Sequence, residues 1–137
     1  MTASSAQENA KTRHRVLLVD DDRRILNFLR LKLMHSGYEV MTAMTGQGAL
    51  SAVEPQKPDI MVLDVMLPGK DGLQVLRELR GCSDLAVIVM SARTDCAAEA
   101  MSLGAHGFIP KPFDPDEMVE SISAVLKQRS TGADSPS

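Results

Sequence analysis

Residues 15–26 read RVLLVDDDRRIL, a short apolar run followed at once by three adjacent aspartates. A run that is apolar on both faces is typical of a strand buried in a parallel sheet. Neighbouring carboxylates repel one another, and at an effective dielectric constant of about 20 two such charges ~4 Å apart cost about 4 kcal/mol. A bound cation would offset this repulsion. The stretch therefore predicts a buried strand with a cation site at its carboxyl end.

The same pattern recurs along the chain. Four more short apolar runs follow: YEVMTA (38–43), DIMVLD (59–64), AVIVMS (86–91) and HGFIPK (106–111). Apolar periodicity and cap residues predict helices between and after these runs, over 22–36, 45–53, 71–80, 95–103 and 114–128. Strand and helix thus alternate five times, which predicts an α/β fold, a doubly wound parallel sheet. In such sheets, ligands bind at the edge where the carboxyl ends of the strands meet.

Single residues set the expected helix ends. Asp22, Asp71 and Asp114 each stand just before a helix, where a carboxylate accepts hydrogen bonds from the first free N–H groups. Pro55 is expected to end the second helix, because proline has no N–H to donate and its ring crowds the preceding turn. The last helix is expected to bury Met118, Ile122, Val125 and Leu126.

The composition suits one soluble domain with a hydrophobic core: the chain has 137 residues, is 44% hydrophobic and carries a net charge of −3. The segments 1–14 and 130–137 are polar, and we interpret them as disordered tails on either side of a domain at 15–129. The acidic balance and the absence of Trp argue against direct nucleic-acid binding.

The sequence also bears on location. No apolar stretch approaches the ~20 residues of a membrane span, and residues 1–14 lack the apolar centre of a secretory signal. The two cysteines, Cys82 and Cys96, do not make a disulfide framework, and Cys96 lies in an alanine-rich segment where a buried thiol is expected. We therefore expect a cytoplasmic protein that does not contact a membrane.

Polar side chains gather where the predicted strands end. Asp20, Asp21 and Asp22 follow the first strand, Asp64 ends the third, Ser91 the fourth and Lys111 the fifth. Carboxylates are the ligands that Mg²⁺ prefers, and a carboxylate is also a natural acceptor for a phosphoryl group. An ammonium and a hydroxyl would stabilise phosphoryl oxygens beside it. Taken together, these groups predict Mg²⁺-dependent phosphoryl chemistry at this edge of the sheet.

Each of these residues alone has an ordinary structural explanation. Asp22 is expected to be a helix cap rather than a ligand, and Asp64 could be a turn residue, since Pro68 and Gly69 follow it. Ser91 could cap the next helix, and Lys111 could be a solvated surface lysine. Only the order of all four strand-end elements on one edge favours the functional interpretation.

Four stretches, VLLVDDD, IMVLDVMLPGKDG, VIVMSAR and GAHGFIPKPF, closely resemble the receiver domain of bacterial two-component response regulators. The resemblance covers residues 15 to 128. It implies a flavodoxin-like (βα)₅ sheet in the order 2-1-3-4-5 and a phosphoacceptor role in a phosphorelay. It also implies a sensor histidine kinase or a phosphotransfer protein as the phosphoryl donor, and an output partner that the sequence does not identify.

The resemblance implies a role for each site residue. Asp64 would be the residue that is phosphorylated, with Ser91 and Lys111 in contact with the phosphoryl group. Mg²⁺ or Mn²⁺ would lie in the acidic pocket of Asp20 and Asp21, with Asp21, Asp64 and the carbonyl of Met66 as ligands. Phe108 would occupy the aromatic switch position, and the Lys111–Pro112 peptide bond would be cis.

The chain departs from the family pattern at the switch and at the last strand. Ser91 stands where Thr is frequent, and Phe108 where Tyr is frequent. GAHGFI stands where receivers of winged-helix transcription factors usually read GADDYL, and the charges that those proteins match along two helices are absent, so we expect a monomer or a weak dimer. Being a phosphoacceptor, the chain is not expected to be an enzyme.

Two other functions are compatible with parts of the sequence. The DDD run offers Asp20 and Asp22 as the D-x-D signature of a haloacid-dehalogenase-like phosphatase, although Arg23 and Arg24 stand where that signature continues differently. A phosphorylation-independent interaction module would need an incomplete site, and every strand-end element is present.

Overall fold

The computed structural model describes residues 13–134, and residues 1–12 and 135–137 of the expected tails lie outside the described residues. The described chain forms a parallel five-stranded sheet in the predicted order β2-β1-β3-β4-β5. The strands are β1 (Arg15–Val19), β2 (Glu39–Ala43), β3 (Ile60–Asp64), β4 (Ala86–Ser91) and β5 (Gly107–Pro110). The chain direction across the sheet reverses between β1 and β3, which is where a doubly wound sheet opens a crevice at its carboxyl edge.

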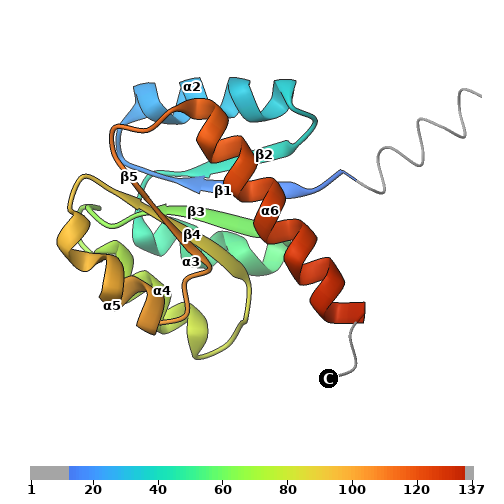
Figure 1. Ribbon diagram of the computed structural model, residues 1–137. Helices are drawn as coiled ribbons and strands as arrows, with labels where there is room; N and C mark the ends of the chain where they lie inside the picture. Colours follow the sequence, from blue (N-terminus) through green and yellow to red (C-terminus); the bar gives the residue numbers. More distant parts are fainter. Residues whose placement is uncertain (1–12, 135–137) are drawn as a thin grey trace, which may run out of the picture.

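Helices cover both faces of the sheet. They are α2 (Arg23–His35), α3 (Gly46–Gln56), α4 (Gly72–Arg80), α5 (Ala97–Ser102) and α6 (Pro115–Asp134), with a short 3₁₀ helix η1 (Thr94–Cys96) before α5. Helices α2 and α6 pack on one face, and α3, α4 and α5 pack on the other (Figure 1). Within residues 13–134, no helix combines the length and the apolar character that a membrane span requires.

The strands supply both halves of the core. In β1, Val16 and Leu18 belong to the layer with α2 and α6, whereas Leu17 and Val19 belong to the layer with α3, α4 and α5. All four side chains are fully buried, which explains why the run is apolar at every position. The sheet therefore holds the strand ends, and the side chains that follow them, on a rigid base.

The helix caps follow the sequence for the most part. Asp22 accepts a hydrogen bond from Arg24 N–H at 2.9 Å, and Asp71 accepts one from Gln74 N–H at 2.9 Å, so both predicted caps are confirmed. Pro55, by contrast, does not end the second helix, because α3 continues to Gln56. Proline in this last turn removes only one helical hydrogen bond, and Lys57 then closes the helix in a left-handed conformation with φ of 50°.

The last two helices also differ from the expected bounds. The segment 95–103 divides into η1 and the shorter α5, and α6 continues through residues 130–134, which the sequence assigned to the tail. Asp114 caps α6 as predicted, with its carboxylate accepting from Asp116 N–H at 2.9 Å. Once a helix is started, each further residue adds a hydrogen bond at little cost, so a polar sequence can extend it. The predicted core residues of this helix are all buried: Met118, Ile122, Val125 and Leu126.

Candidate functional site

Three polar side chains are buried at the carboxyl edge of the sheet. Among the described residues, Asp20, Asp64 and Ser91 are the charged or polar ones that are buried, with exposures of 0%, 4% and 0%. Asp64 ends β3, Ser91 ends β4, and Asp20 directly follows β1, so three neighbouring strands bring them together. Polar groups are seldom buried without partners, because losing water is costly unless hydrogen bonds replace it.

Lys111 supplies the first set of partners. Its Nζ donates to Asp20 Oδ2 at 2.8 Å and to Asp64 Oδ2 at 3.1 Å, and its side chain is itself largely buried. The Lys111 backbone N–H donates to Ser91 O at 2.9 Å, which anchors the loop after β5 to the end of β4. The Lys111–Pro112 peptide bond is cis, as the resemblance implied.

Backbone N–H groups hold the other carboxylate oxygens. Asp20 Oδ1 accepts from Asp22 N–H at 2.8 Å, and Asp64 Oδ1 accepts from Met66 N–H at 3.1 Å. Gly72 makes this arrangement compact, because a side chain there would collide with the carbonyl oxygen of Asp64. The sequence did not predict these two backbone donors, because the site was inferred from side chains. The turn residues after Asp64 were the only indication of a backbone donor there.

The electrostatics follow from this packing. Burial raises the pKa of Asp64 above its ordinary value, and the hydrogen bonds from Met66 and Lys111 only partly oppose that effect. Burial also lowers the pKa of Lys111, but the bonds and charges of Asp20 and Asp64 together outweigh it, and the net shift of Lys111 is upward. The ammonium therefore stays protonated between the two carboxylates.

The acidic cluster fits a divalent cation. Asp20, Asp21 and Asp64 each place one carboxylate oxygen within 4.8 Å of the others, and Asp21 is exposed to solvent. Three carboxylates and one ammonium leave a charge of −2, which a divalent cation would neutralise. The donor set is all oxygen, as Mg²⁺ prefers. The side chain of Asp22 is engaged in capping α2 and lies outside this set.

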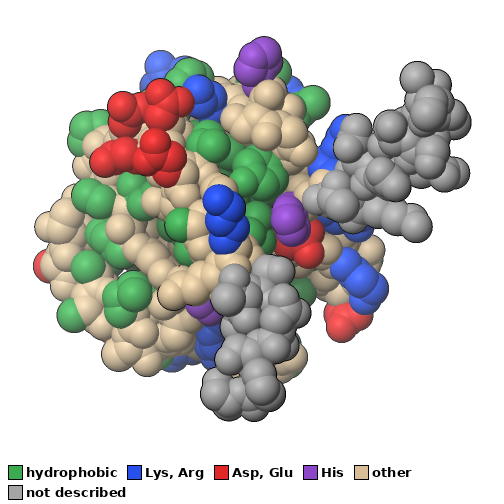
Figure 2. Space-filling model, turned by 45° about the vertical axis from the view of Figure 1, so that its right-hand side comes forward, with side chains coloured by type: hydrophobic (Ala, Val, Ile, Leu, Met, Phe, Trp, Pro, Cys, Tyr) green, Lys and Arg blue, Asp and Glu red, His purple; other side chains and the backbone are tan. Residues whose placement is uncertain are grey.

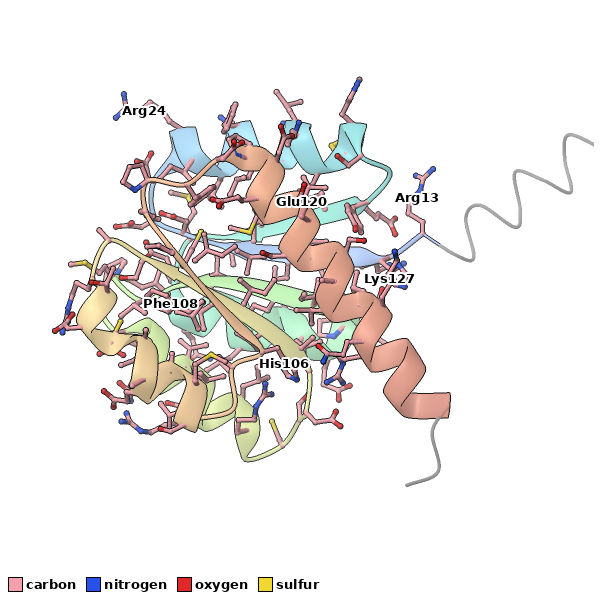
Figure 3. The ribbon with its side chains drawn as sticks, in the orientation of Figure 1. Arg13, Arg24, His106, Phe108, Glu120 and Lys127 are labelled. Atoms are coloured by element: carbon pink, nitrogen blue, oxygen red, sulfur yellow. The ribbon has the colours of Figure 1, made fainter. Side chains whose placement is uncertain are left out.

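The remaining predicted residues surround this cluster. Ser91 Oγ accepts a hydrogen bond from Arg93 N–H at 2.9 Å. Met66 follows Asp64 by two residues and exposes 53% of its surface. Phe108 is half-buried on β5 and packs against the core layer of α3, α4 and α5 (Figure 3).

Comparison with known proteins agrees with the fold. The sequence model of the response regulator receiver domain matches residues 16–123. The chain therefore belongs to the receiver domain family of two-component response regulators, and the fold class and family expected from the sequence are confirmed.

Individual relatives support this assignment. The chain is 41% identical over 121 residues to the transcriptional regulatory protein KdpE of Mycobacterium tuberculosis, covering 87% of this chain and 54% of KdpE. It is 41% identical over 127 residues to the response regulator MprA of a Mycobacterium species, covering 89% of this chain and 55% of MprA. The chain thus spans about half the length of the curated relatives it matches.

Solved structures match over nearly the whole domain. The receiver domain of the Francisella response regulator 1452 superposes with a TM-score of 0.80 at 30% identity, covering 85% of this chain and 98% of that one. A CheY-like receiver domain protein from Methanospirillum hungatei gives a TM-score of 0.83 at 27% identity, covering 88% and 99%.

Proposed function

We propose that Asp64 is the phosphoacceptor of this receiver domain and takes its phosphoryl group from a phosphohistidine of a sensor histidine kinase or phosphotransfer protein. The observation that carries the proposal is that both oxygens of the Asp64 carboxylate are positioned by hydrogen bonds: Oδ1 accepts from Met66 N–H, and Oδ2 accepts from Lys111 Nζ. In the transfer, one Asp64 oxygen forms a bond to phosphorus while the phosphorus–nitrogen bond of the donor histidine breaks. Positioning of this kind supplies most of the catalysis in phosphoryl transfer.

The metal is part of the proposal. Asp20, Asp21 and Asp64, together with the carbonyl of Met66, would hold Mg²⁺ or Mn²⁺, supported by the all-oxygen donor set and the charge of −2. When bound, such a cation supplies positive charge beside the phosphoryl oxygens. Asp20 has a second role in this proposal, since it keeps Lys111 next to Asp64.

Ser91, Lys111 and Phe108 are proposed to respond to the phosphoryl group. A serine hydroxyl has one proton to donate, and because Ser91 Oγ accepts from Arg93 N–H, that proton is available for a phosphoryl oxygen. Lys111 can exchange a carboxylate oxygen of Asp64 for a phosphoryl oxygen as its partner. Phe108 lies on β5, the strand paired with β4, so movement of Ser91 reaches it through one strand pairing.

A cavity beside the site suits the docking of the donor protein. It has a volume of about 330 Å³, it opens next to Lys111, and its lining is mostly apolar: Ile25, Phe28, Leu29, Ala92, Lys111, Pro112 and Phe113. Helix α2 borders it with Phe28 and Leu31 exposed, and the helix carries four basic and no acidic residues. An apolar centre with a charged rim is the usual anatomy of a protein–protein contact.

On the face drawn in Figure 2, Lys and Arg side chains lie in several separate places, whereas Asp and Glu side chains gather in a patch at the upper left. Together with the net charge of −3, this supports the proposal that the domain acts on proteins rather than directly on nucleic acid. We propose the cytoplasm as its place of work, which the two free cysteines support. Turnover of a free substrate is not part of the proposal, and the phosphatase alternative has no support, because Asp22 is a helix cap.

Intact-mass spectrometry tests the assignment. The protein is incubated with acetyl phosphate and Mg²⁺, and we expect one added phosphoryl group, which EDTA prevents. The Asp64→Asn variant should remain unmodified, and Asp71→Asn, which removes a carboxylate from a helix cap outside the cluster, serves as the matched control. Equal modification of wild type and Asp64→Asn would refute the role of Asp64.

A further inference from the structure

Arg93 and Asp95, which flank Thr94 just after β4, form a two-point ion pair at the rim of the site. Arg93 Nε donates to Asp95 Oδ1 at 3.3 Å, and Arg93 Nη2 donates to Asp95 Oδ2 at 3.1 Å. Two guanidinium nitrogens thus face two carboxylate oxygens, the fork geometry that orients an arginine. Their hydrogen bonds, and secondly their charges, raise the pKa of Arg93 and lower that of Asp95. At rest, the guanidinium is held at Asp95.

The backbone of Arg93 is fixed, so the side chain is the part that can move. The Arg93 N–H donates to Ser91 Oγ at 2.9 Å, and the Arg93 carbonyl accepts from Cys96 Sγ at 3.0 Å. Ser91 ends β4, and β4 pairs with β3, which ends in Asp64. The arginine side chain therefore begins two residues after Ser91, on the loop that leaves the strand next to the one that ends in Asp64.

This ion pair is weak. The side chains of Arg93 and Asp95 are 54% and 72% exposed, so water and salt screen their attraction. A phosphoryl group on Asp64 would bring a more strongly charged acceptor to the same rim, and a guanidinium pairs well with phosphate oxygens. Two acceptors, the Asp95 carboxylate and the phosphoryl group, would then compete for one guanidinium.

We propose that Asp95 is a positioning residue that holds Arg93 away from the phosphoryl position, and that Arg93 moves from Asp95 to the phosphoryl oxygens when Asp64 is modified. The inference rests on the proposed phosphorylation of Asp64. Asp95 would then act as a brake, meaning that it makes the modified state less stable, because Arg93 must give up its contact with Asp95 before it can contact the phosphoryl group.

Beryllofluoride, a phosphoryl mimic that binds aspartate, tests the brake without any turnover. The probe is titrated with Mg²⁺ into ¹⁵N-labelled protein, and the apparent dissociation constant is taken from backbone amide shifts. Asp95→Asn should bind about two- to fivefold more tightly than wild type, a modest gain because an exposed ion pair is weak. Asp95→Glu, which keeps the carboxylate, should bind like wild type.

Two further measurements separate this role from a general effect of charge. In an Arg93→Ala background, Asp95→Asn should leave the affinity unchanged, since no guanidinium remains to be released. The side-chain Nε–H resonance of Arg93 should shift when beryllofluoride binds to wild type, and in Asp95→Asn it should start from an unpaired position. The amide spectra of the free variants show that each is folded.

Three results would overturn the inference: equal affinities of wild type and Asp95→Asn, the same gain in the Arg93→Ala background, or an Arg93 Nε–H resonance that beryllofluoride does not move. If these occur while wild type binds beryllofluoride at Asp64, the inference fails and the proposed function stands. A wild-type protein that binds no beryllofluoride overturns the proposed function, and this inference with it.

Discussion

Within residues 13–134, Lys111 is the cation that pairs with the two buried carboxylates, and replacing it by methionine removes that charge. Lys111 Nζ lies 2.8 Å from Asp20 Oδ2 and 3.1 Å from Asp64 Oδ2, and the side chains of these aspartates are only 1% and 5% exposed. Methionine keeps the length and apolar character of the lysine stem, so the change in packing is small. The variant therefore isolates the loss of the charge.

The expected loss of stability is large. Removing one partner of a buried ion pair costs ~3–5 kcal/mol, because the other charge remains buried without compensation. Here the neighbouring Asp21 is exposed, and water can reach the cluster from its side, so we expect about 3 kcal/mol in metal-free buffer. With a urea m-value of about 2 kcal/mol per molar, the unfolding midpoint should fall by about 1.5 M.

Urea unfolding followed by far-ultraviolet circular dichroism measures this loss, in EDTA and in Mg²⁺. Because the lost ammonium and a bound cation compensate the same charges, Mg²⁺ should narrow the gap between Lys111→Met and wild type. In an Asp64→Asn background the substitution should cost much less, since only Asp20 is left unpaired. A loss below about 1 kcal/mol in EDTA, or an equal loss in the Asp64→Asn background, would refute the reasoning.

Three further predictions concern other parts of the domain. Gly72→Ala should destabilise the fold by about 1–3 kcal/mol and prevent phosphorylation, because the new methyl group collides with the backbone of β3. Gly107→Ala is the control: its methyl group would meet nothing closer than 3.7 Å, so the variant should behave like wild type in urea unfolding and in the phosphorylation assay. Asp22→Ala should lower stability by about 1 kcal/mol through the lost cap of α2 but leave phosphorylation intact, and unmodified protein in intact-mass spectra would contradict the capping role. Burial, and then the charges of Arg129 and Arg80, lower the pKa of His106, so on acidification the unfolded chain takes up the proton before the folded one does. The free energy of unfolding should therefore fall as the pH drops below about 6.5. His106→Gln should reduce that fall between about pH 7.5 and 5.5, and an identical fall in wild type and variant would refute this role of His106.

The sequence predicted which side chains meet at the carboxyl edge of the sheet, because the pattern that marks each of them is local. A buried strand in a parallel sheet reads as an apolar run, and the residue at its carboxyl end is visible in the sequence, as Asp64 and Ser91 are. Parallel topology then places those ends on one edge without further information. The caps Asp22 and Asp71 were predictable for the same reason, since a cap bonds to the next turn of its own helix.

Features that depend on distant partners, or on a small balance of energies, could not be predicted this way. The contact of Lys111 with both Asp20 and Asp64 spans 91 and 47 residues, so only the fold reveals that one ammonium serves two carboxylates. The extension of α3 past Pro55 and of α6 past residue 128 reflects fractions of a kcal/mol per residue, which local patterns do not resolve. The pair of Arg93 and Asp95 depends on the turn that η1 makes.

The charge balance of the site links its resting structure to its proposed response. Without a cation, Lys111 compensates only part of the negative charge of Asp20, Asp21 and Asp64, and its ammonium bridges the two buried carboxylates. A phosphoryl group on Asp64 would add negative charge to a cluster that already has an excess, so every cationic or donor group within reach gains by turning toward it. We propose that Lys111, Ser91 and Arg93 are those groups: Ser91 ends β4, and Arg93 and Lys111 stand on the loops that follow β4 and β5. The modification would therefore pull on two neighbouring loops together, and these loops lead into η1 and α6. A change in one carboxylate would therefore act on the side of the domain that carries Phe108 and not on the opposite edge at β2.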